Sequence, residues 1–138
     1  MTQEEKIHAA LASGKMDAEK LGAKVGRDAR LLESIFRGTS SKLPRVKFGC
    51  SKALVLLSVK HPNLIYGEID KVIALLGSDN QILKWNAIAI LGNLATVDQR
   101  RRLPGLLERL FGFLSGGELI TANNAISALS KIGRALPG

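Results

Sequence analysis

The stretch VIALLGSDNQILKWNAIAILGNLA, residues 72–95, decides the fold of this chain. Two apolar segments flank a five-residue polar break, and each has the apolar spacing of a helix that packs on one side. Gly77 is suited to end the first helix, and Ser78 or Asp79 to cap the second, because a short polar side chain accepts hydrogen bonds from free backbone N–H groups. The stretch therefore predicts a pair of helices, and nothing in it indicates catalysis.

The same pattern of helix, break and helix occurs three times. Segments 30–58, 70–95 and 108–133 each place an apolar helix end before a break, and a second apolar helix after it. Their second helices align Val46, Leu83 and Thr121, then Cys50, Ala87 and Ala125, then Leu54, Leu91 and Leu129. The offsets are 37 and 38 residues, within the range of about 33–47 residues that is typical of helical-pair repeats. The sequence therefore predicts a repeated helical scaffold.

The composition fits one ordered domain. Of 138 residues, 46% are hydrophobic and 23% are charged, which favours a folded chain over a disordered one. The first residues lack the pattern of a secretory signal, and no apolar run approaches the ~18 residues of a membrane span. We therefore expect a cytoplasmic protein. Cys50 is the sole cysteine, so the sequence predicts no internal disulfide and a small buried side chain at that position.

The net charge of +8 is spread unevenly along the chain. Residues 1–33 are neutral, residues 34–67 carry six bases and no acid, residues 68–99 come to −2, and residues 100–138 come to +4. Basic patches of this kind attract anionic partners of any class. The candidate phosphate contacts are Arg37, Lys42, Arg45, Lys60, Arg100, Arg101 and Arg102.

The middle repeat carries a recognisable pattern of residues. Asp79 stands in the break, Leu83 and Lys84 follow it, and Ala87 and Leu91 place a small and a large apolar residue four apart. The first repeat matches at Val46, Lys47, Cys50 and Leu54. The third repeat departs from the pattern in its break and at the pair that follows it. This pattern resembles the HEAT and armadillo repeat family of α-solenoids.

The resemblance implies an all-α, right-handed α-solenoid of about three HEAT-like helix pairs with an N-terminal capping helix, in one domain over residues 1–138. The expected parts are the capping helix within 1–16 and repeats at 17–60, 61–97 and 98–135. The expected helices span residues 2–14, 17–37, 44–60, 63–77, 80–97, 100–115 and 118–135. In the first of these helices, Ile7, Ala10 and Leu11 are expected to face inward.

Helical geometry locates the outward side of the second helix in each pair. At 100° per residue, the inward residues of helix 44–60 are Val46, Cys50, Ala53, Leu54 and Leu57. The outward residues of the same helix include Phe48, Lys52, Val55 and Val59. In the family it resembles, these helices line a concave groove. The resemblance thus implies a partner-binding strip of Phe48, Lys52, Trp85 and Asn123, flanked by Lys47 and Lys84.

Two interpretations of the aromatic residues in this strip stay open. Aromatic anchors with flanking lysines favour recognition of an acidic partner segment. Packing of Phe48 and Trp85 against neighbouring helices is the alternative. Armadillo proteins carry an Asn at the position of Asn93 that binds an extended peptide, but Leu56 and Lys131 occupy the equivalent positions here. We therefore expect Asn93 to cap local backbone.

No arrangement of residues indicates catalysis, a metal or a cofactor. His8 and His61 are the only histidines, and His61 precedes Pro62 in a predicted turn. The strings SGK at 13–15 and GTSSK at 38–42 lack the glycine spacing of a phosphate-binding loop. Some HEAT-like proteins are DNA glycosylases that use a buried Asp, but no Asp lies on the predicted outward side. We expect no catalytic residue, no metal ligand and no enzymatic activity.

A non-enzymatic protein-interaction scaffold that binds a partner protein or acidic segment is the favoured function. The alternative is a basic nucleic-acid-binding module, whose affinity falls steeply with salt, and a glycosylase-like enzyme is the least favoured. No membrane partner is expected. The flank of helix 118–135, with Ile126 and Ile132, favours a homo-oligomer through the C-terminal repeat, or packing against a further repeat.

Overall fold

The computed structural model describes residues 1–136, and over that range the chain is all-helical, with no strand. No helix in this range is long and apolar enough to cross a membrane. The α-helices are α1 (Gln3–Ser13), α2 (Ala18–Arg27), α3 (Leu32–Gly38), α4 (Pro44–Lys60), α5 (Pro62–Tyr66), α6 (Ile69–Leu75), α7 (Gln81–Asn93), α8 (Leu107–Gly112) and α9 (Leu119–Ala135). The 3-10 helices are η1 (Ala29–Leu31), η2 (Leu94–Val97), η3 (Pro104–Leu106) and η4 (Phe113–Ser115).

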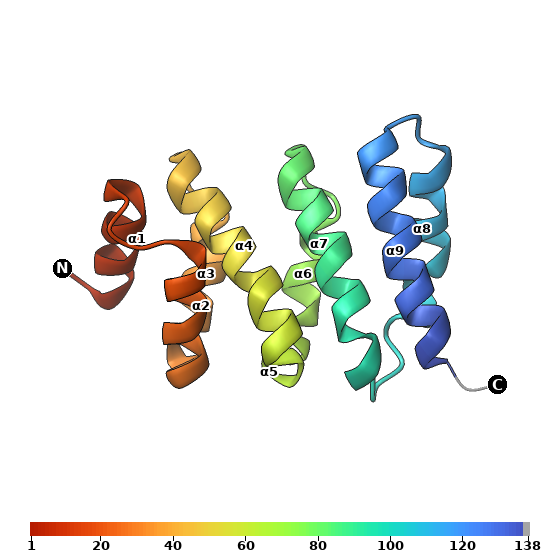
Figure 1. The fold of residues 1–138 in the computed structure, drawn as a ribbon, viewed down its shortest axis with the longest axis horizontal. Helices are drawn as coiled ribbons and strands as arrows, with labels where there is room; N and C mark the ends of the chain where they lie inside the picture. The colour runs from red at the N-terminus through yellow and green to blue at the C-terminus, as the bar shows by residue number, and fades with distance from the viewer. Residues whose placement is uncertain (137–138) are drawn as a thin grey trace.

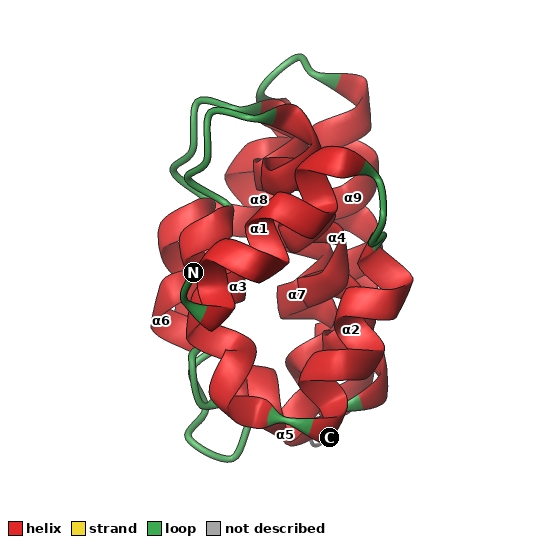
Figure 2. Ribbon diagram, turned by 90° about the vertical axis from the view of Figure 1, so that its left-hand side faces the viewer, coloured by secondary structure: helices red, strands yellow, loops and turns green. Residues whose placement is uncertain are grey.

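The helices form two layers along the long axis of the molecule (Figure 1). In the front layer α2, α4, α7 and α9 follow one another in chain order, and α4 packs against both α2 and α7. Behind them α3, α6 and α8 pack against α4, α7 and α9 respectively. Seen from the N-terminal end, α3, α6 and α8 lie to the left and α4, α7 and α9 to the right (Figure 2). We call the succession α4, α7, α9 the helix row.

The helices of the row confirm the predicted second helices of the three pairs. The predicted helix 44–60 is α4 with the same bounds, and Pro44 occupies its first turn, where a missing N–H costs nothing. The predicted helix 118–135 is α9, which begins one residue later. The predicted helix 80–97 is α7 followed by η2, so its last turn tightens into a 3-10 helix.

The N-terminal cap of α7 is Asn80, and the prediction of Ser78 or Asp79 was wrong. The Asn80 side-chain oxygen Oδ1 accepts a hydrogen bond from the Leu83 backbone N–H at 3.1 Å. Ser78 Oγ instead accepts a hydrogen bond from the Asn80 N–H at 3.1 Å. The hydroxyl therefore holds the turn, and the amide that follows it starts the helix.

The first helices of the pairs are more interrupted than the sequence predicts. The predicted helix 17–37 is α2, η1 and α3, because Asp28 ends α2 and its carboxylate accepts the backbone N–H of Arg30 to begin a new turn. The predicted helix 63–77 is α5 and α6, separated at Gly67 and Glu68. Two helices, α1 and α2, thus precede α3 at the N-terminal end, where one was expected.

The predicted helix 100–115 begins late, at Pro104. The cause is Asp98, whose carboxylate oxygens accept hydrogen bonds from the backbone N–H groups of Arg102 at 2.8 Å and Leu103 at 2.9 Å. These bonds hold the residues after η2 in a loop. Proline then provides a helix start through η3 into α8.

The predicted inward face of α1 is largely confirmed. Ile7 and Leu11 are each 2% exposed, and Ala10 is half-buried. An ion pair between Glu4 and Arg37, with 2.6 Å between the carboxylate and the guanidinium, ties α1 to α3. This helix therefore covers the N-terminal end of the core.

A single hydrophobic cluster runs from α1 to α9. The predicted inward residues of α4 are all buried, namely Val46, Cys50, Ala53, Leu54 and Leu57. A Cβ atom added at Gly38 would lie 2.3 Å from Cys50 Sγ, so glycine at this position lets α3 pack directly on α4. The two layers therefore share one core, and the packing of α3, α6 and α8 against the row holds its helices in place.

Candidate binding face of the helix row

Side-chain hydrogen bonds join neighbouring helices of the row. The Asn86 side-chain amide donates to Ser51 Oγ at 2.5 Å, which links α7 to α4. Two turns further along the same helices, the Asn93 amide donates to Ser58 Oγ at 3.0 Å. All four side chains are buried or half-buried, where a lost hydrogen bond costs free energy. The pairs therefore fix the register of α7 on α4.

Asn93 also links α7 to α9. Its Oδ1 accepts a hydrogen bond from Lys131 Nζ at 2.7 Å. The expectation that Asn93 caps local backbone was therefore wrong: both ends of its amide are bound to side chains of neighbouring helices. We call Ser51, Ser58, Asn86, Asn93 and Lys131 the polar ladder.

Sequence reasoning missed the polar ladder, although a signal was present. Ser51 and Ser58 are seven residues apart, and so are Asn86 and Asn93. Seven residues are close to two helical turns, so each pair lies on one side of its helix. The equal spacing of small hydroxyls on one predicted helix and amides on the next favours pairing between them.

The residues of the predicted partner-binding strip differ in their exposure to solvent. Lys52 and Asn123 are exposed on the row, whereas Phe48 and Trp85 are half-buried. The indole N–H of Trp85 donates to Thr121 Oγ1 at 2.8 Å, so this ring lies against α9. The aromatic residues therefore contribute to packing within the row as well as to its surface.

The two lysines predicted to flank the strip also contact aromatic rings. Lys47 Nζ lies 6.0 Å from the centroid of the Phe48 ring, and Lys84 Nζ lies 5.8 Å from that of Phe113. Both lysines are half-buried. A cation over an aromatic face is weakly attracted to it. These lysines keep their charge near the row while their stems cover apolar surface.

On α4 and α9 the exposed side follows the predicted phase, but on α7 between them Trp85 and Ala89 are half-buried and Gly92 is buried. On α4, Lys52 is exposed, Val59 is 64% exposed and Val55 is half-buried. On α9 the exposed residues of this side are Asn123, Ser127, Ser130 and Arg134. We call this exposed side of α4, α7 and α9 the helix-row face.

The charge of the row differs from that of the helices behind it. The helices of the row carry seven bases and no acid, namely Arg45, Lys47, Lys52 and Lys60 on α4, Lys84 on α7, and Lys131 and Arg134 on α9. Behind them, α3, α6 and α8 each carry one acid and one base, and α5 carries neither. The excess positive charge of the helix pairs is therefore concentrated in one layer.

A groove of about 390 Å³ lies where α4, α7 and α9 end. Ser58, Asn93 and Lys131 of the polar ladder line it, together with Arg134 and exposed Val59. No carboxylate lines this groove. A basic side chain near a helix C-terminus also interacts favourably with the helix dipole, which holds the positive charge in place. The groove therefore suits an anionic group.

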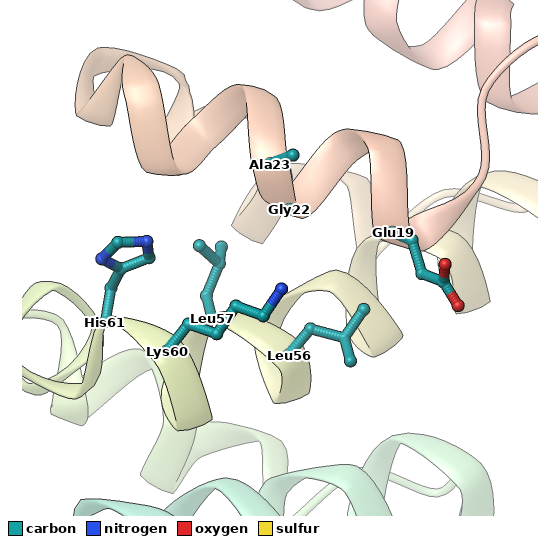
Figure 3. A pocket seen from close by; sticks show the side chains of 7 residues that line it. All are labelled: Glu19, Gly22, Ala23, Leu56, Leu57, Lys60 and His61. Carbon is teal, nitrogen blue, oxygen red and sulfur yellow. The ribbon is translucent and has the colours of Figure 1, made fainter.

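A second cavity, of about 320 Å³, lies between α2 and α4 (Figure 3). Gly22, Ala23, Leu56 and Leu57 give it an apolar lining. The polar residues that line it are Glu19, Lys60 and His61. In Figure 3, Glu19 and His61 lie at opposite ends of the cavity, with Lys60 and the leucines between them. This cavity therefore suits an apolar group beside a charged one.

The predicted phosphate contacts on α4 and before it are not one patch. Arg37, Lys42 and Arg45 lie near the start of this 17-residue helix, whereas Lys60 ends it, roughly 25 Å away. Arg37 is also paired with Glu4, and the hydrogen bond from Arg37 lowers the pKa of that carboxyl. The structure thus brings these four bases together only in part.

Of the three arginines after α7, Arg100 and Arg102 have side chains that hold their own loop. Arg102 is hydrogen-bonded to Asp70, which lowers the pKa of this carboxyl. The Arg100 guanidinium lies 5.1 Å from the Tyr66 ring centroid and donates to the Tyr66 carbonyl at 3.4 Å. Arg101 has a φ of 53°, in the left-handed region. These contacts attach the loop before α8 to α5 and α6.

Two observations within residues 1–136 concern metal-binding side chains and the cysteine. These residues contain no group of three or more His, Cys, Asp or Glu side chains that could hold a metal ion. Cys50 is fully buried, and burial raises the pKa of its thiol to about 12. A thiol of this kind is a poor nucleophile at neutral pH.

No protein-family model matches the chain, and no curated protein shows significant sequence similarity to it. The arrangement of the chain's own residues therefore carries the functional argument.

Proposed function

We propose that this chain is a non-enzymatic interaction module, and that its helix-row face binds an acidic segment of a partner protein. The proposed architecture is a right-handed α-solenoid of three HEAT-like helix pairs behind an N-terminal cap. The order α4, α7, α9 in one layer supports it, as do the offsets of 37 and 38 residues between their aligned positions. By the same resemblance, the helix-row face is the concave side.

The charge of the row carries the proposal. Seven bases and no acid on α4, α7 and α9 contrast with the balanced helices behind them. A face of one charge sign accelerates encounter with a segment of the opposite sign and disfavours basic partners. The groove beside Lys131 and Arg134 offers donors that a carboxylate can reach without meeting another acid.

A nucleic acid is the less favoured partner. Its phosphates would need bases in a continuous track, but the predicted contacts fall near opposite ends of α4. Arg37 and Arg102 are already paired with carboxylates. The groove beside Lys131 and Arg134 and the apolar cavity between α2 and α4 suit the mixed chemistry of a peptide better.

A charge-removal experiment tests the proposed face. The probe is a fluorescein-labelled peptide of alternating Glu and Ser, titrated with the full chain while anisotropy is recorded. The triple variant Lys52→Gln, Lys131→Gln, Arg134→Gln should weaken binding by about tenfold, because each exposed charge pair contributes about 0.5 kcal/mol. Raising the salt concentration should also lower the affinity of the unmodified chain for the peptide, because salt screens the charges.

The matched control removes the same charge elsewhere. Lys6, Lys71 and Arg109 lie outside the row, on α1, α6 and α8. Changing all three to Gln should leave the affinity within about twofold of the unmodified chain. Equal losses in both triple variants would show that net charge, and not the helix-row face, drives binding, and would overturn the proposal.

We also propose that two copies of the chain pair through the C-terminal helix pair. Of the ten large apolar side chains exposed within residues 1–136, six lie between Phe111 and Leu136. Ile126 is 53% exposed on the side of α9 opposite Ala128, whereas the aligned Ile88 of α7 is fully buried against the core. An exposed apolar flank of this kind suits a two-fold contact between copies.

One predicted member of this flank was wrong. Ile132 is only 2% exposed, because it lies on the same side of α9 as Ala125 and Ala128 and packs inward. The test is light scattering after size-exclusion chromatography at high protein concentration. We expect a dimer that the substitution Ile126→Lys converts to a monomer, and a monomer before substitution would contradict the pairing.

A further inference from the structure

The two cavities of the front layer lie on either side of one exposed ridge. On α4 this ridge is formed by Lys52, Val55 and Val59. Leu56 and Lys60, on its α2 side, line the first cavity, and Ser58, on its α7 side, lines the groove near α9. At 100° per residue, Leu56 and Lys60 fall on one side of this ridge and Ser58 falls on the other. A ligand that crosses α4 therefore meets both cavities in turn.

The cavity between α2 and α4 favours an apolar side chain. Leu56 is half-buried, Leu57 is 2% exposed, and Gly22 opposite them adds no side chain (Figure 3). A Cβ atom at Gly22 would already lie 3.9 Å from Leu56 Cβ, in ordinary contact distance. The volume of about 320 Å³ exceeds that of a leucine side chain and leaves the cavity open to solvent. An apolar group there would be removed from water against the leucines.

The groove at the ends of α4, α7 and α9 favours a carboxylate. Lys131 uses one N–H on Asn93, and an ammonium group has three. Arg134 lines the same groove and is exposed. Asn93 is satisfied on both sides by Ser58 and Lys131, so it positions the lysine and does not compete for the ligand.

We infer that the helix-row face recognises an extended segment that places an apolar residue and an acidic residue about six to eight positions apart. The apolar side chain enters the cavity between α2 and α4, and the carboxylate binds Lys131 and Arg134. The cavity lies about half a helix spacing on the α2 side of α4, and Lys131 and Arg134 lie on α9, two spacings from α4 in the row. Packed helices are about 8–10 Å apart, so the two sites are about 20–25 Å apart. An extended chain that advances about 3.3 Å per residue covers this distance in about six to eight residues. This inference rests on the proposed function and adds a sequence requirement to it.

The chemistry of the pair of cavities favours a peptide over a nucleic acid. Neither cavity is lined by Phe, Tyr or Trp, and single-stranded nucleic acids gain much of their affinity from stacking on such rings. The cavity between α2 and α4 is mainly apolar, and the Glu19 carboxylate that also lines it repels a phosphate. A segment of protein supplies both an apolar and an acidic side chain from one backbone.

The test uses labelled peptides that carry one Leu and one pair of adjacent Glu residues in a Gly-Ser background, with the separation varied in both chain directions. Anisotropy of the full chain with each peptide should show the tightest binding at a separation of about six to eight residues, about tenfold tighter than at a separation of one. A control peptide has Ser in place of Leu. Its affinity reports the contribution of charge alone.

Two variants assign the two contacts. Ala23 is exposed on α2 and lines the apolar cavity, so Ala23→Leu should fill the cavity with little effect on folding. This variant should bind the Leu and Ser peptides equally well. The double variant Lys131→Gln, Arg134→Gln should keep the preference for Leu over Ser and lose about fivefold in affinity for every peptide.

The outcomes separate this inference from the proposed function. Binding that depends on Glu but not on the separation or on Ala23 would overturn the inference and leave the acidic-segment proposal standing. Failure of every acidic peptide to bind would overturn both. Preferential binding of mixed-sequence duplex DNA, with displacement of the peptides, would also overturn both.

Discussion

The indole N–H of Trp85 donates a hydrogen bond to the hydroxyl oxygen of Thr121 over 2.8 Å, and this bond joins α7 to α9. Thr121 is 4% exposed and Trp85 is half-buried, so the bond is shielded from much of the solvent. It lies near the start of both helices, while the bond between Asn93 and Lys131 lies toward their ends. The two contacts together hold α9 parallel to α7 in the row.

Replacing Thr121 with Val should destabilise the chain by about 1–2 kcal/mol, because Val has a similar shape but cannot accept the indole N–H. Urea denaturation followed by far-ultraviolet circular dichroism measures this change. The matched control is Ser127→Ala, an exposed hydroxyl on the same helix, which should change stability by less than about 0.5 kcal/mol. Equal stability of Thr121→Val and the unmodified chain would show that solvent replaces the bond.

The polar ladder should show energetic coupling between α4 and α7. In a double-mutant cycle, Ser58→Ala and Asn93→Ala should each reduce the free energy of unfolding, and their effects should fail to add by about 1 kcal/mol. The pair Ser58→Ala with Asn86→Ala provides the control cycle, because Asn86 binds Ser51 instead. Additive losses in the first cycle would contradict a direct bond between Ser58 and Asn93.

Two glycines in the row should respond in opposite ways to the same substitution. A Cβ atom at Gly92 would lie 2.9 Å from Ala128 Cα. Gly92→Ala should therefore push α7 away from α9 and lower the free energy of unfolding by about 1–2 kcal/mol. Gly133 is in the interior of α9, with no neighbour within 4 Å of an added Cβ. Gly133→Ala should therefore raise the free energy of unfolding by about 0.5–1 kcal/mol, because alanine lowers the conformational entropy of the unfolded chain.

Thermal or urea unfolding of both glycine variants compares them in one experiment. A loss of stability at Gly133 equal to that at Gly92 would indicate that alanine is unfavourable at both positions for a reason other than the contact between α7 and α9.

The stability that α1 gains from Glu4 should depend on pH. The hydrogen bond from Arg37 lowers the pKa of Glu4 from its ordinary value of 4.5. A lowered pKa means that the contribution is fully present above 4.5 and is lost as the pH falls through the folded-state pKa. Glu4→Gln should therefore reduce the free energy of unfolding at neutral pH, and the difference from the unmodified chain should shrink in acid.

Urea titrations at several pH values measure this difference. The control is Glu108→Gln, which changes an exposed carboxylate of α8 and should have little effect at any pH. A difference for Glu4→Gln that is constant from neutral to acid pH would show that the ionised carboxylate is not what stabilises α1 on α3.

The row could be predicted from the sequence because its local signals agree. Pro44 starts α4, the inward residues of α4 recur at helical spacing, and the aligned positions repeat at 37 and 38 residues. The first helices of the pairs could not be bounded in the same way. Asp28 and Asp98 interrupt them through side-chain hydrogen bonds to backbone N–H groups, and apolar periodicity continues across those breaks.

The sequence predicted which side of α4 faces solvent, but not the contacts between helices at the candidate site. The phase of α4 gave Lys52 as exposed, and the structure confirms it. Asn93 was misread because its partners, Ser58 and Lys131, lie on other helices, and a single helix carries no information on cross-helix pairing. The charge difference between the row and the helices behind it was likewise not predictable, because it depends on which helices lie side by side. Only the three-dimensional arrangement shows this.

Nuclear magnetic resonance can locate the binding face that we assign to α4, α7 and α9. Backbone amide shifts of the isotope-labelled chain would be followed during titration with the alternating Glu-Ser peptide. We expect the largest shifts on α4, α7 and α9, around Lys52, Lys131 and Arg134, and a decrease of the shifts at higher salt. Shifts confined to α3, α6 and α8, or none at all at saturating peptide, would show that the row is not the binding face.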